Sequence, residues 1–250
     1  MLPLFLIGII AAICSAGGLP EGVVGLEENG HYGLAADFSL PSSFIGPPVF
    51  SCLKKAGFSI VFLPIYNAHV HPHWISDAFF NIPAAIRAGL GVEVYMVPKY
   101  HAFKEEQGLV QMNEAAGVFT NTPLKTRRIW IKVKTQNFDD DTRYNKEFLT
   151  EMISTAQKLN IDVGIYTNRK QWDFITGEWN LGGHKLWYWN VTDVGRGGET
   201  PANFENFRSF GGWTEPTVKQ FGKREKICGV MVNWDVYDVR RLKHYETQKV

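Results

Sequence analysis

The chain has 250 residues, of which 45% are hydrophobic and 20% charged, and its formal net charge at pH 7 is +1. These fractions are ordinary for a globular protein, and so small a net charge argues against the broad basic surface that nucleic-acid binding needs. Length alone leaves one or two domains open, because α/β barrels of this size often form a single unit.

The chain begins with an uncharged, mostly apolar segment. Residues 1–16 run from Leu2 to Ile13 before three small residues, Cys14-Ser-Ala16. The segment is short for a membrane span, and its small residues suit signal peptidase. We therefore expect a signal peptide at 1–16, a Gly-rich lead at 17–30 and one domain at 31–250. The alternative is an N-terminal membrane anchor, since the segment lacks a basic residue.

Two further features agree with export to the extracellular space. Once Cys14 leaves with the signal peptide, Cys52 and Cys228 remain, and two cysteines in an exported chain favour one disulfide. Asn190-Val-Thr192 is an N-glycosylation sequon, which is used only in the secretory pathway. We expect a secreted protein whose mature form has no membrane attachment.

The body of the chain alternates apolar runs of strand length with amphipathic runs of helix length. We expect strands at Tyr32–Ala36, Phe58–Leu63, Val92–Val97, Arg128–Val133 and Ile161–Tyr166, and helices at Val49–Ala56, Ile75–Ala88, Glu105–Val118, Thr142–Leu159 and Arg169–Thr176. Later strands at Lys185–Trp189, Thr217–Phe221 and Gly229–Val232 are separated by loops rich in Gly and Pro.

Continuous apolar strands with helices between them indicate a parallel sheet that is covered on both faces. The pattern predicts a single-domain α/β fold, an irregular eight-stranded β/α (TIM-like) barrel whose late connections lack helices. A doubly wound open sheet is the alternative.

In barrel enzymes the chemistry gathers where the C-terminal ends of the strands meet their loops. The polar and aromatic residues near those ends are Asp37, Tyr66, Asn67, Glu93, Tyr95, Lys132, Lys134, Tyr166, Trp187, Asn233 and Asp235. We expect Asn233 and Asp235 to follow the eighth strand. A cleft built from these side chains combines aromatic rings, which stack on sugar rings, with charged groups.

Eight segments, taken in order, carry a resemblance to a known family. They are Gly33–Pro41, Phe50–Phe58, Val92–Pro98, Arg128–Ile131, Val163–Tyr166, Leu186–Tyr188, Phe210–Trp213 and Cys228–Val230. Together they resemble the nematode and protist branch of the glycoside hydrolase family 25 lysozymes. The resemblance implies an irregular β/α barrel that cleaves the N-acetylmuramic acid–N-acetylglucosamine link of bacterial peptidoglycan. It implies an Asp ending strand one, an Asp-x-Glu pair ending strand four whose Glu donates the proton, and an Asp after strand eight.

The chain departs from this pattern at its acids. Asp37 matches the strand-one Asp, but the Asp-x-Glu pair falls on Lys132 and Lys134, and the strand-eight Asp falls on Asn233 with Asp235 two positions later. Residues i and i+2 of a strand face the same side, so the pair belongs in one cleft. A lysine, with an ordinary pKa of about 10.4, donates a proton poorly near neutrality, and its charge opposes a developing oxocarbenium ion. We therefore predict lost or much reduced catalysis.

Other interpretations of these residues stay open. In one alternative, Asp37 caps a turn or pairs with one of the lysines instead of contacting a ligand. In another, the lysines form a solvated edge instead of part of the cleft. A positively charged floor favours an anionic ligand. Glu93 is the nearest alternative proton donor. We expect Tyr66, Glu93, Tyr95, Tyr166, Trp187 and Asp235 to contact substrate.

We expect no metal and no cofactor. The alternating histidines at 69, 71 and 73 have Pro72 between them and no acidic partner nearby, which favours a surface loop.

The sequence thus predicts a monomeric, secreted lysozyme-like protein of innate immunity or bacterial digestion that binds peptidoglycan-type glycans. One alternative is an active N-acetylmuramidase that uses Glu93, Asp37 or Asp235 in a rearranged site. Another is a barrel scaffold recruited for protein binding.

Overall fold

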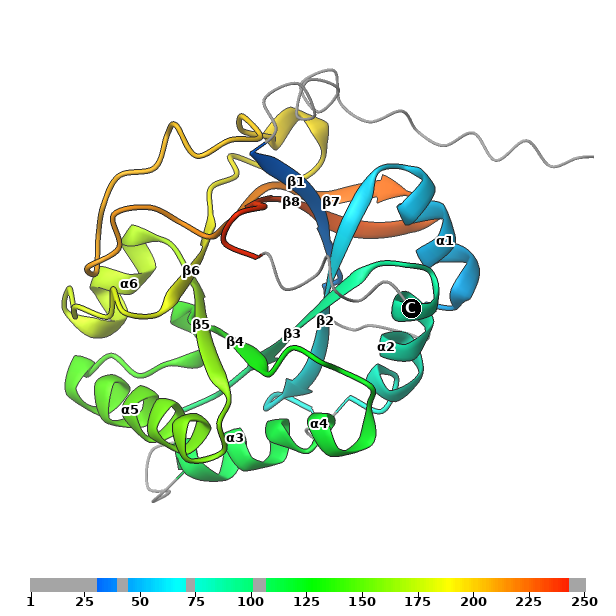
Figure 1. Cartoon of the computed structure of the whole chain (residues 1–250). Helices are drawn as coiled ribbons and strands as arrows, with labels where there is room; N and C mark the ends of the chain where they lie inside the picture. The colour runs from blue at the N-terminus through cyan, green and yellow to red at the C-terminus, as the bar shows by residue number, and fades with distance from the viewer. Residues whose placement is uncertain (1–30, 40–44, 71–74, 101–106, 243–250) are drawn as a thin grey trace, which may run out of the picture.

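The computed structural model describes residues 31–39, 45–70, 75–100 and 107–242. Its eight strands form a closed barrel in chain order (Figure 1). The strands are β1 (Tyr32–Asp37), β2 (Phe58–Asn67), β3 (Gly91–Val97), β4 (Arg128–Lys132), β5 (Asp162–Thr167), β6 (Lys185–Trp189), β7 (Val218–Ile227) and β8 (Val230–Asp238). The expected single-domain, irregular eight-stranded barrel is confirmed. The predicted signal peptide and lead lie outside the described residues.

Helices cover only part of the barrel. The helices are α1 (Pro47–Lys55), α2 (Ala78–Arg87), α3 (Gln107–Ala116), α4 (Val118–Asn121), α5 (Thr142–Lys158) and α6 (Arg169–Thr176), with 3-10 turns η1 (Thr135–Asn137) and η2 (Arg196–Gly198). In Figure 1 the helices ring the outside of β1 to β6, and loops cover the side of β6 to β8. One long helix expected from residue 105 to 118 is instead two, α3 and α4, because the chain turns at Gly117.

The expected all-parallel sheet is wrong at β8, which runs antiparallel to both β7 and β1. The cause is the two-residue turn Cys228-Gly229, whose φ angles of 53° and 78° suit a tight hairpin. The hairpin also makes β7 and β8 longer than predicted. Lys223, Arg224 and Lys226 are exposed on it, and their charges hid the strand in the sequence pattern.

A layer of aromatic side chains fills the barrel interior. Trp187 lies at its centre, with ring centroids 4.2 Å from Phe62, 4.7 Å from Tyr166 and 5.9 Å from Trp130. Gly164 makes room for Trp130, because a Cβ there would lie 2.2 Å from the indole. This layer fills the barrel interior below the C-terminal ends of β1 to β7.

A disulfide ties the β7–β8 hairpin to the helical layer. Cys52 of α1 is bonded to Cys228 in the hairpin turn, with the two Cα atoms 5.8 Å apart. Figure 1 shows the hairpin reaching across to α1. The bridge therefore holds the outer end of β7 and β8 at a fixed place beside the mouth of the barrel.

Candidate functional site

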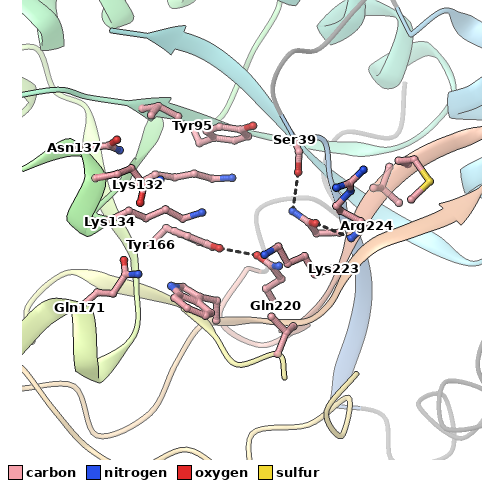
Figure 2. A pocket seen from close by; sticks show the side chains of 17 residues that line it. Ser39, Tyr95, Lys132, Lys134, Asn137, Tyr166, Gln171, Gln220, Lys223 and Arg224 are labelled. Atoms are coloured by element: carbon pink, nitrogen blue, oxygen red, sulfur yellow. Dashed lines mark hydrogen bonds between the residues drawn. The ribbon is translucent and has the colours of Figure 1, made fainter. Parts of the chain in front are cut away.

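A pocket of about 840 Å³ opens at the C-terminal ends of the parallel strands. Its walls come from strands β3 to β8, together with η1 and α6. The cavity is large enough for a sugar of one or two rings. Figure 2 shows Lys132 and Lys134 extending into it from one side, with Lys223 and Arg224 on the opposite side.

The floor of the pocket is a buried ion pair. The Nζ atom of Lys132 lies 3.0 Å and 3.3 Å from the two carboxylate oxygens of Asp37. Asp37 is fully buried and Lys132 is 6% exposed. The Nδ2 atom of Asn233 donates to Asp37 Oδ2 at 2.9 Å and to Ser39 Oγ at 3.0 Å. Asp37 thus has a cation and an amide donor, which is the alternative role considered for it from the sequence.

Three aromatic rings enclose the Lys132 ammonium. Its Nζ lies 3.7 Å from the ring centroid of Tyr95, 4.8 Å from that of Tyr166 and 4.9 Å from that of Trp187. Such contacts stabilise a desolvated cation through the negative faces of the rings. The Tyr95 hydroxyl donates to the Phe38 carbonyl at 2.5 Å, which fixes that ring. The Lys132 ammonium is therefore held by these three rings and by Asp37.

A second acid, Asp235, lies one pleat deeper. It is fully buried, pairs with Ala35 of β1 in the register, and accepts a hydrogen bond of 2.7 Å from Trp187 Nε1. Burial, reinforced by the negative charge of Asp37, raises the pKa of Asp235 well above its usual range. The Oδ2 atom of Asp235 has no hydrogen-bond partner among the described residues.

Lys134 differs from Lys132, although it lies only two residues further along. It is partly buried, and its Nζ lies 5.1 Å from the Tyr166 ring centroid. No hydrogen bond or ion pair joins its ammonium group to any of the described residues. Burial, followed by the charge of Lys132, lowers the pKa of Lys134 to about 8. Lys134 is therefore a cation at neutral pH without a partner acid.

The opposite wall adds two cations that sequence reasoning missed. Lys223 and Arg224 are exposed residues of β7 that line the pocket. The left-handed backbone at Arg224, with φ of 56°, marks an irregular register with β8, and its backbone N–H donates to Asn233 Oδ1 at 3.1 Å. The signal that could have found them is the Cys-Gly turn, which predicts a hairpin extending above the barrel. No carboxyl side chain lines the pocket in the described part of the chain.

Three pocket-lining residues carry a buried polar atom without a described partner. These atoms are Asn137 Nδ2, Gln171 Oε1 and Trp189 Nε1. Asn137 is oriented by a 2.8 Å contact between its Oδ1 and His69 Nε2. Unsatisfied buried polar atoms are rare in folded proteins and call for a ligand or water. Here they gather on the wall formed by η1, α6 and β6.

The structure brings together most of the residues singled out in the sequence. Tyr95, Lys132, Lys134, Tyr166 and Asn233 line the pocket. Asp37, Trp187 and Asp235 lie directly beneath it, in contact with Lys132 or with each other. Asn233 and Asp235 lie within β8 rather than after it, because that strand continues to Asp238.

Tyr66 and Glu93 lie elsewhere, which corrects their expected place in the cleft. A register shift between Pro64 and Tyr66 turns Tyr66 outward into the apolar layer beneath the helices, where it hydrogen-bonds the Glu114 side chain. Glu93 points into the lower barrel, where its oxygens accept from Arg128 at 2.8 Å and Trp130 Nε1 at 2.6 Å. Burial raises the pKa of Glu93, but the aromatic layer separates it from the pocket.

The described residues contain no group of three or more His, Cys, Asp or Glu placed to hold a metal ion. His71 and His73 lie outside the described ranges. Across the same ranges no helix is long and apolar enough to cross a membrane. Asn190 of the sequon directly follows β6 and is partly buried. Its glycosylation stays a prediction.

Comparison with known proteins gives consistent results. The family model for Lysozyme-like protein 1 matches residues 28–221. Lysozyme-like protein 7 of Caenorhabditis elegans is 41% identical over 189 residues, which cover 74% of this chain and 66% of that protein. The bacterial lysozyme of Streptomyces coelicolor superposes with a TM-score of 0.63 at 18% identity, covering 86% of this chain and 98% of the other. A family GH25 lysozyme of Aspergillus fumigatus gives 0.61 at 14% identity, with coverage of 86% and 98%.

Proposed function

The chain belongs to the lysozyme-like proteins related to glycoside hydrolase family 25, and from this premise we propose that it is a secreted protein that binds peptidoglycan-type glycans with lost or much reduced muramidase activity. Its role is in innate immunity or bacterial digestion. The observation that carries the proposal is the Lys132–Asp37 ion pair on the floor of a pocket lined by aromatic and amide groups.

The ion pair bears directly on catalysis. Cleavage of a glycosidic bond needs a protonated acid at the leaving oxygen and negative charge near the anomeric carbon. Asp37 is neutralised by an ammonium 3.0 Å away, and Asp235, whose pKa is raised by burial, is held beneath the pocket by a hydrogen bond from Trp187. In the sequence comparison, Lys132 and Lys134 occupy the positions of the family's Asp-x-Glu pair. The unpaired Lys134 ammonium opposes the positive charge that develops on the sugar in the transition state.

Other features support glycan binding and export. The half-buried ring of Trp189 offers a face for sugar stacking, and Asn137 and Gln171 offer polar groups for hydroxyl and N-acetyl substituents. The pocket has the volume of a small-molecule site. The Cys52–Cys228 bridge is the kind of cross-link that persists in oxidising, extracellular compartments.

The test of catalysis is turbidity clearing of Gram-positive cell walls by purified protein. Wild type should clear at the rate of buffer or only slightly faster. Lys134→Glu alone should also fail, because the neighbouring Lys132 ammonium would keep the new carboxyl ionised. The double variant Lys132→Asp/Lys134→Glu restores both acids and should gain lysis. Robust clearing by wild type would instead favour an active muramidase that uses Asp37, Asp235 or Glu93.

The test of binding is retention on insoluble peptidoglycan. The wild-type protein should sediment with the polymer, whereas the exposed Lys55→Gln variant serves as a matched control that should behave like wild type. Absence of retention would overturn the proposal and leave a barrel scaffold that binds another protein. Size-exclusion chromatography of the same samples checks the predicted monomer.

A further inference from the structure

The geometry points to a specific ligand feature: we propose that the pocket recognises a carboxylate carried by an N-acetylated sugar, held between Lys134 on one wall and Lys223 and Arg224 on the other. This inference rests on the proposed glycan binding and names the chemical class of the glycan. It concerns the residues of the pocket wall, none of which takes part in the ion pair of the floor.

The first argument is the charge balance of the pocket. Lys132, Lys134, Lys223 and Arg224 all line it, and no described Asp or Glu side chain does. Asp37 neutralises Lys132 from below, so three cations remain without a described acid. Lys223 faces Lys134 across the same cavity, and its charge adds to the burial and the Lys132 charge that lower the pKa of Lys134. An anion between them would relieve this repulsion.

The second argument is the set of unpaired hydrogen-bond donors in residues that line the same pocket as Lys134. Asn137 Nδ2 and Trp189 Nε1 are both buried donors without a described acceptor, and both residues line the pocket. A carboxylate accepts several hydrogen bonds at once, and those with a charged partner are the strongest. The nearby Gln171 Oε1 lacks a donor, and it can accept from the N–H of an acetamido group.

The shape of the site favours a sugar acid over other anions. The cations lie on opposite walls of a cavity of about 840 Å³ rather than along an open surface, which suits a compact ligand with one acidic substituent. The half-buried ring of Trp189 borders the same cavity, so a sugar ring can stack on it while its substituent reaches Lys134. A nucleic-acid backbone needs an extended basic track, which a net charge of +1 does not provide.

The experiment compares three disaccharides by calorimetric titration: N-acetylglucosaminyl-N-acetylmuramic acid, its methyl ester, and N,N′-diacetylchitobiose. The free acid should bind about tenfold or more tightly than either neutral probe, the ratio expected for a charge-assisted hydrogen bond. In Lys134→Gln this ratio should fall below about threefold, whereas Lys134→Arg should retain it. The exposed Lys223→Gln variant should lower the ratio partially, and Lys55→Gln should leave it unchanged.

The pH dependence provides a second readout. The groups that face Lys134 are Lys132, Asp37, Lys223 and the Tyr166 ring. Because the pKa of Lys134 is lowered to about 8, preference for the free acid should weaken between pH 7 and pH 9 in wild type. In Lys134→Arg, which stays charged, the preference should persist.

Equal affinity for the acid and its ester would overturn the proposal while leaving glycan binding intact. If no disaccharide binds although the protein is retained on insoluble peptidoglycan, the pocket is not the saccharide site and the proposal also fails. Loss of both soluble and insoluble binding would remove the proposed function itself. Retention of the full ratio in Lys134→Gln, with the fold confirmed by circular dichroism, would exclude Lys134 as the recognising group.

Discussion

The floor and the wall of the pocket treat two neighbouring lysines in opposite ways. Lys132 is buried, paired with Asp37 and enclosed by three aromatic rings. Lys134 is only partly buried, has no acid partner among the described residues, and its pKa is lowered to about 8. Of these two lysines, Lys132 is thus part of the buried floor, whereas Lys134 remains available to a ligand.

The difference follows from the depth at which each lysine lies along the barrel axis. Lys132 is the last residue of β4 and its side chain reaches the level of Asp37, where water is excluded. Lys134 is the residue before η1, above the end of the strand, where the barrel opens. A cation must be neutralised where water is absent, whereas it can stay unpaired where solvent or a ligand reaches it.

The largest effect should come from breaking the floor. Lys132→Met removes the cation and leaves the Asp37 carboxylate buried with an amide donor only, which should lower the free energy of unfolding by about 3–5 kcal/mol. Urea unfolding followed by tryptophan fluorescence measures it. Adding Asp37→Asn to Lys132→Met should recover most of the loss, because the uncompensated charge is gone. If Lys132→Met costs no more than Lys134→Met, floor and wall do not differ as described.

The next largest effect should come from releasing the hairpin that carries the far wall. Replacing both cysteines, Cys52→Ser and Cys228→Ser, should lower the free energy of unfolding by about 2–4 kcal/mol, because the unfolded chain is no longer cross-linked. Hydrogen exchange should accelerate at the outer end of β7 and β8 but not at Asp37. Reduced wild type is the control and should behave alike. Uniform acceleration over the whole barrel would show that the bridge does not act on the wall alone.

A smaller effect is expected at the second buried acid. Burial raises the pKa of Asp235, so the folded state holds a proton that the unfolded state loses above about pH 4. The stability that this proton contributes is complete at low pH and falls as pH rises. Asp235→Asn, which mimics the neutral acid, should therefore change stability by less than about 1 kcal/mol at pH 7. Its stability relative to wild type should increase from pH 4 to pH 7. A loss as large as that of Lys132→Met would mean that Asp235 is ionised.

A comparably small effect, here a gain in stability, should come from the wall. The fold disfavours the Lys134 ammonium, since its pKa of about 8 lies below the unfolded value of about 10.4. The cost is complete below pH 8 and disappears as pH rises toward 10.4. Lys134→Met should thus be more stable than wild type by up to about 1 kcal/mol at pH 7, and the two should converge by pH 10. Lys55→Met, at an exposed site, should show no such pH dependence.

Sequence patterns predicted the order of strands and helices because periodicity and Gly-rich breaks are local signals. The same strand-end rule placed Asp37, Lys132 and Lys134 near one another, and the structure joins the first two at 3.0 Å. The rule could not predict that a side chain expected to face the barrel interior would instead face outward. Tyr66 turns outward because of a register shift after Pro64, and nothing in the local pattern marks that shift.

The sequence also could not predict how deep each side chain lies along the barrel axis. Glu93 and Tyr95 lie on the same face of β3, yet Glu93 pairs with Arg128 below the aromatic layer while Tyr95 lines the pocket above it. A strand pattern gives the facing of a side chain but not its level, since the level depends on the stagger of neighbouring strands. Lys223 and Arg224 were missed for a related reason: their strand extends beyond the barrel on a solvated hairpin.

The Cys52–Cys228 bridge has a consequence for proteolysis. It closes a covalent ring over a sequence separation of 176 residues, a segment that contains every strand from β2 to β7. A protease that cuts once inside this ring opens a loop without dividing the molecule, because both fragments stay joined through sulfur. Strands β1 and β8 lie outside the ring and pair with each other along their length. A singly cleaved chain therefore remains one covalent molecule until its disulfide is reduced, and its two fragments cannot diffuse apart.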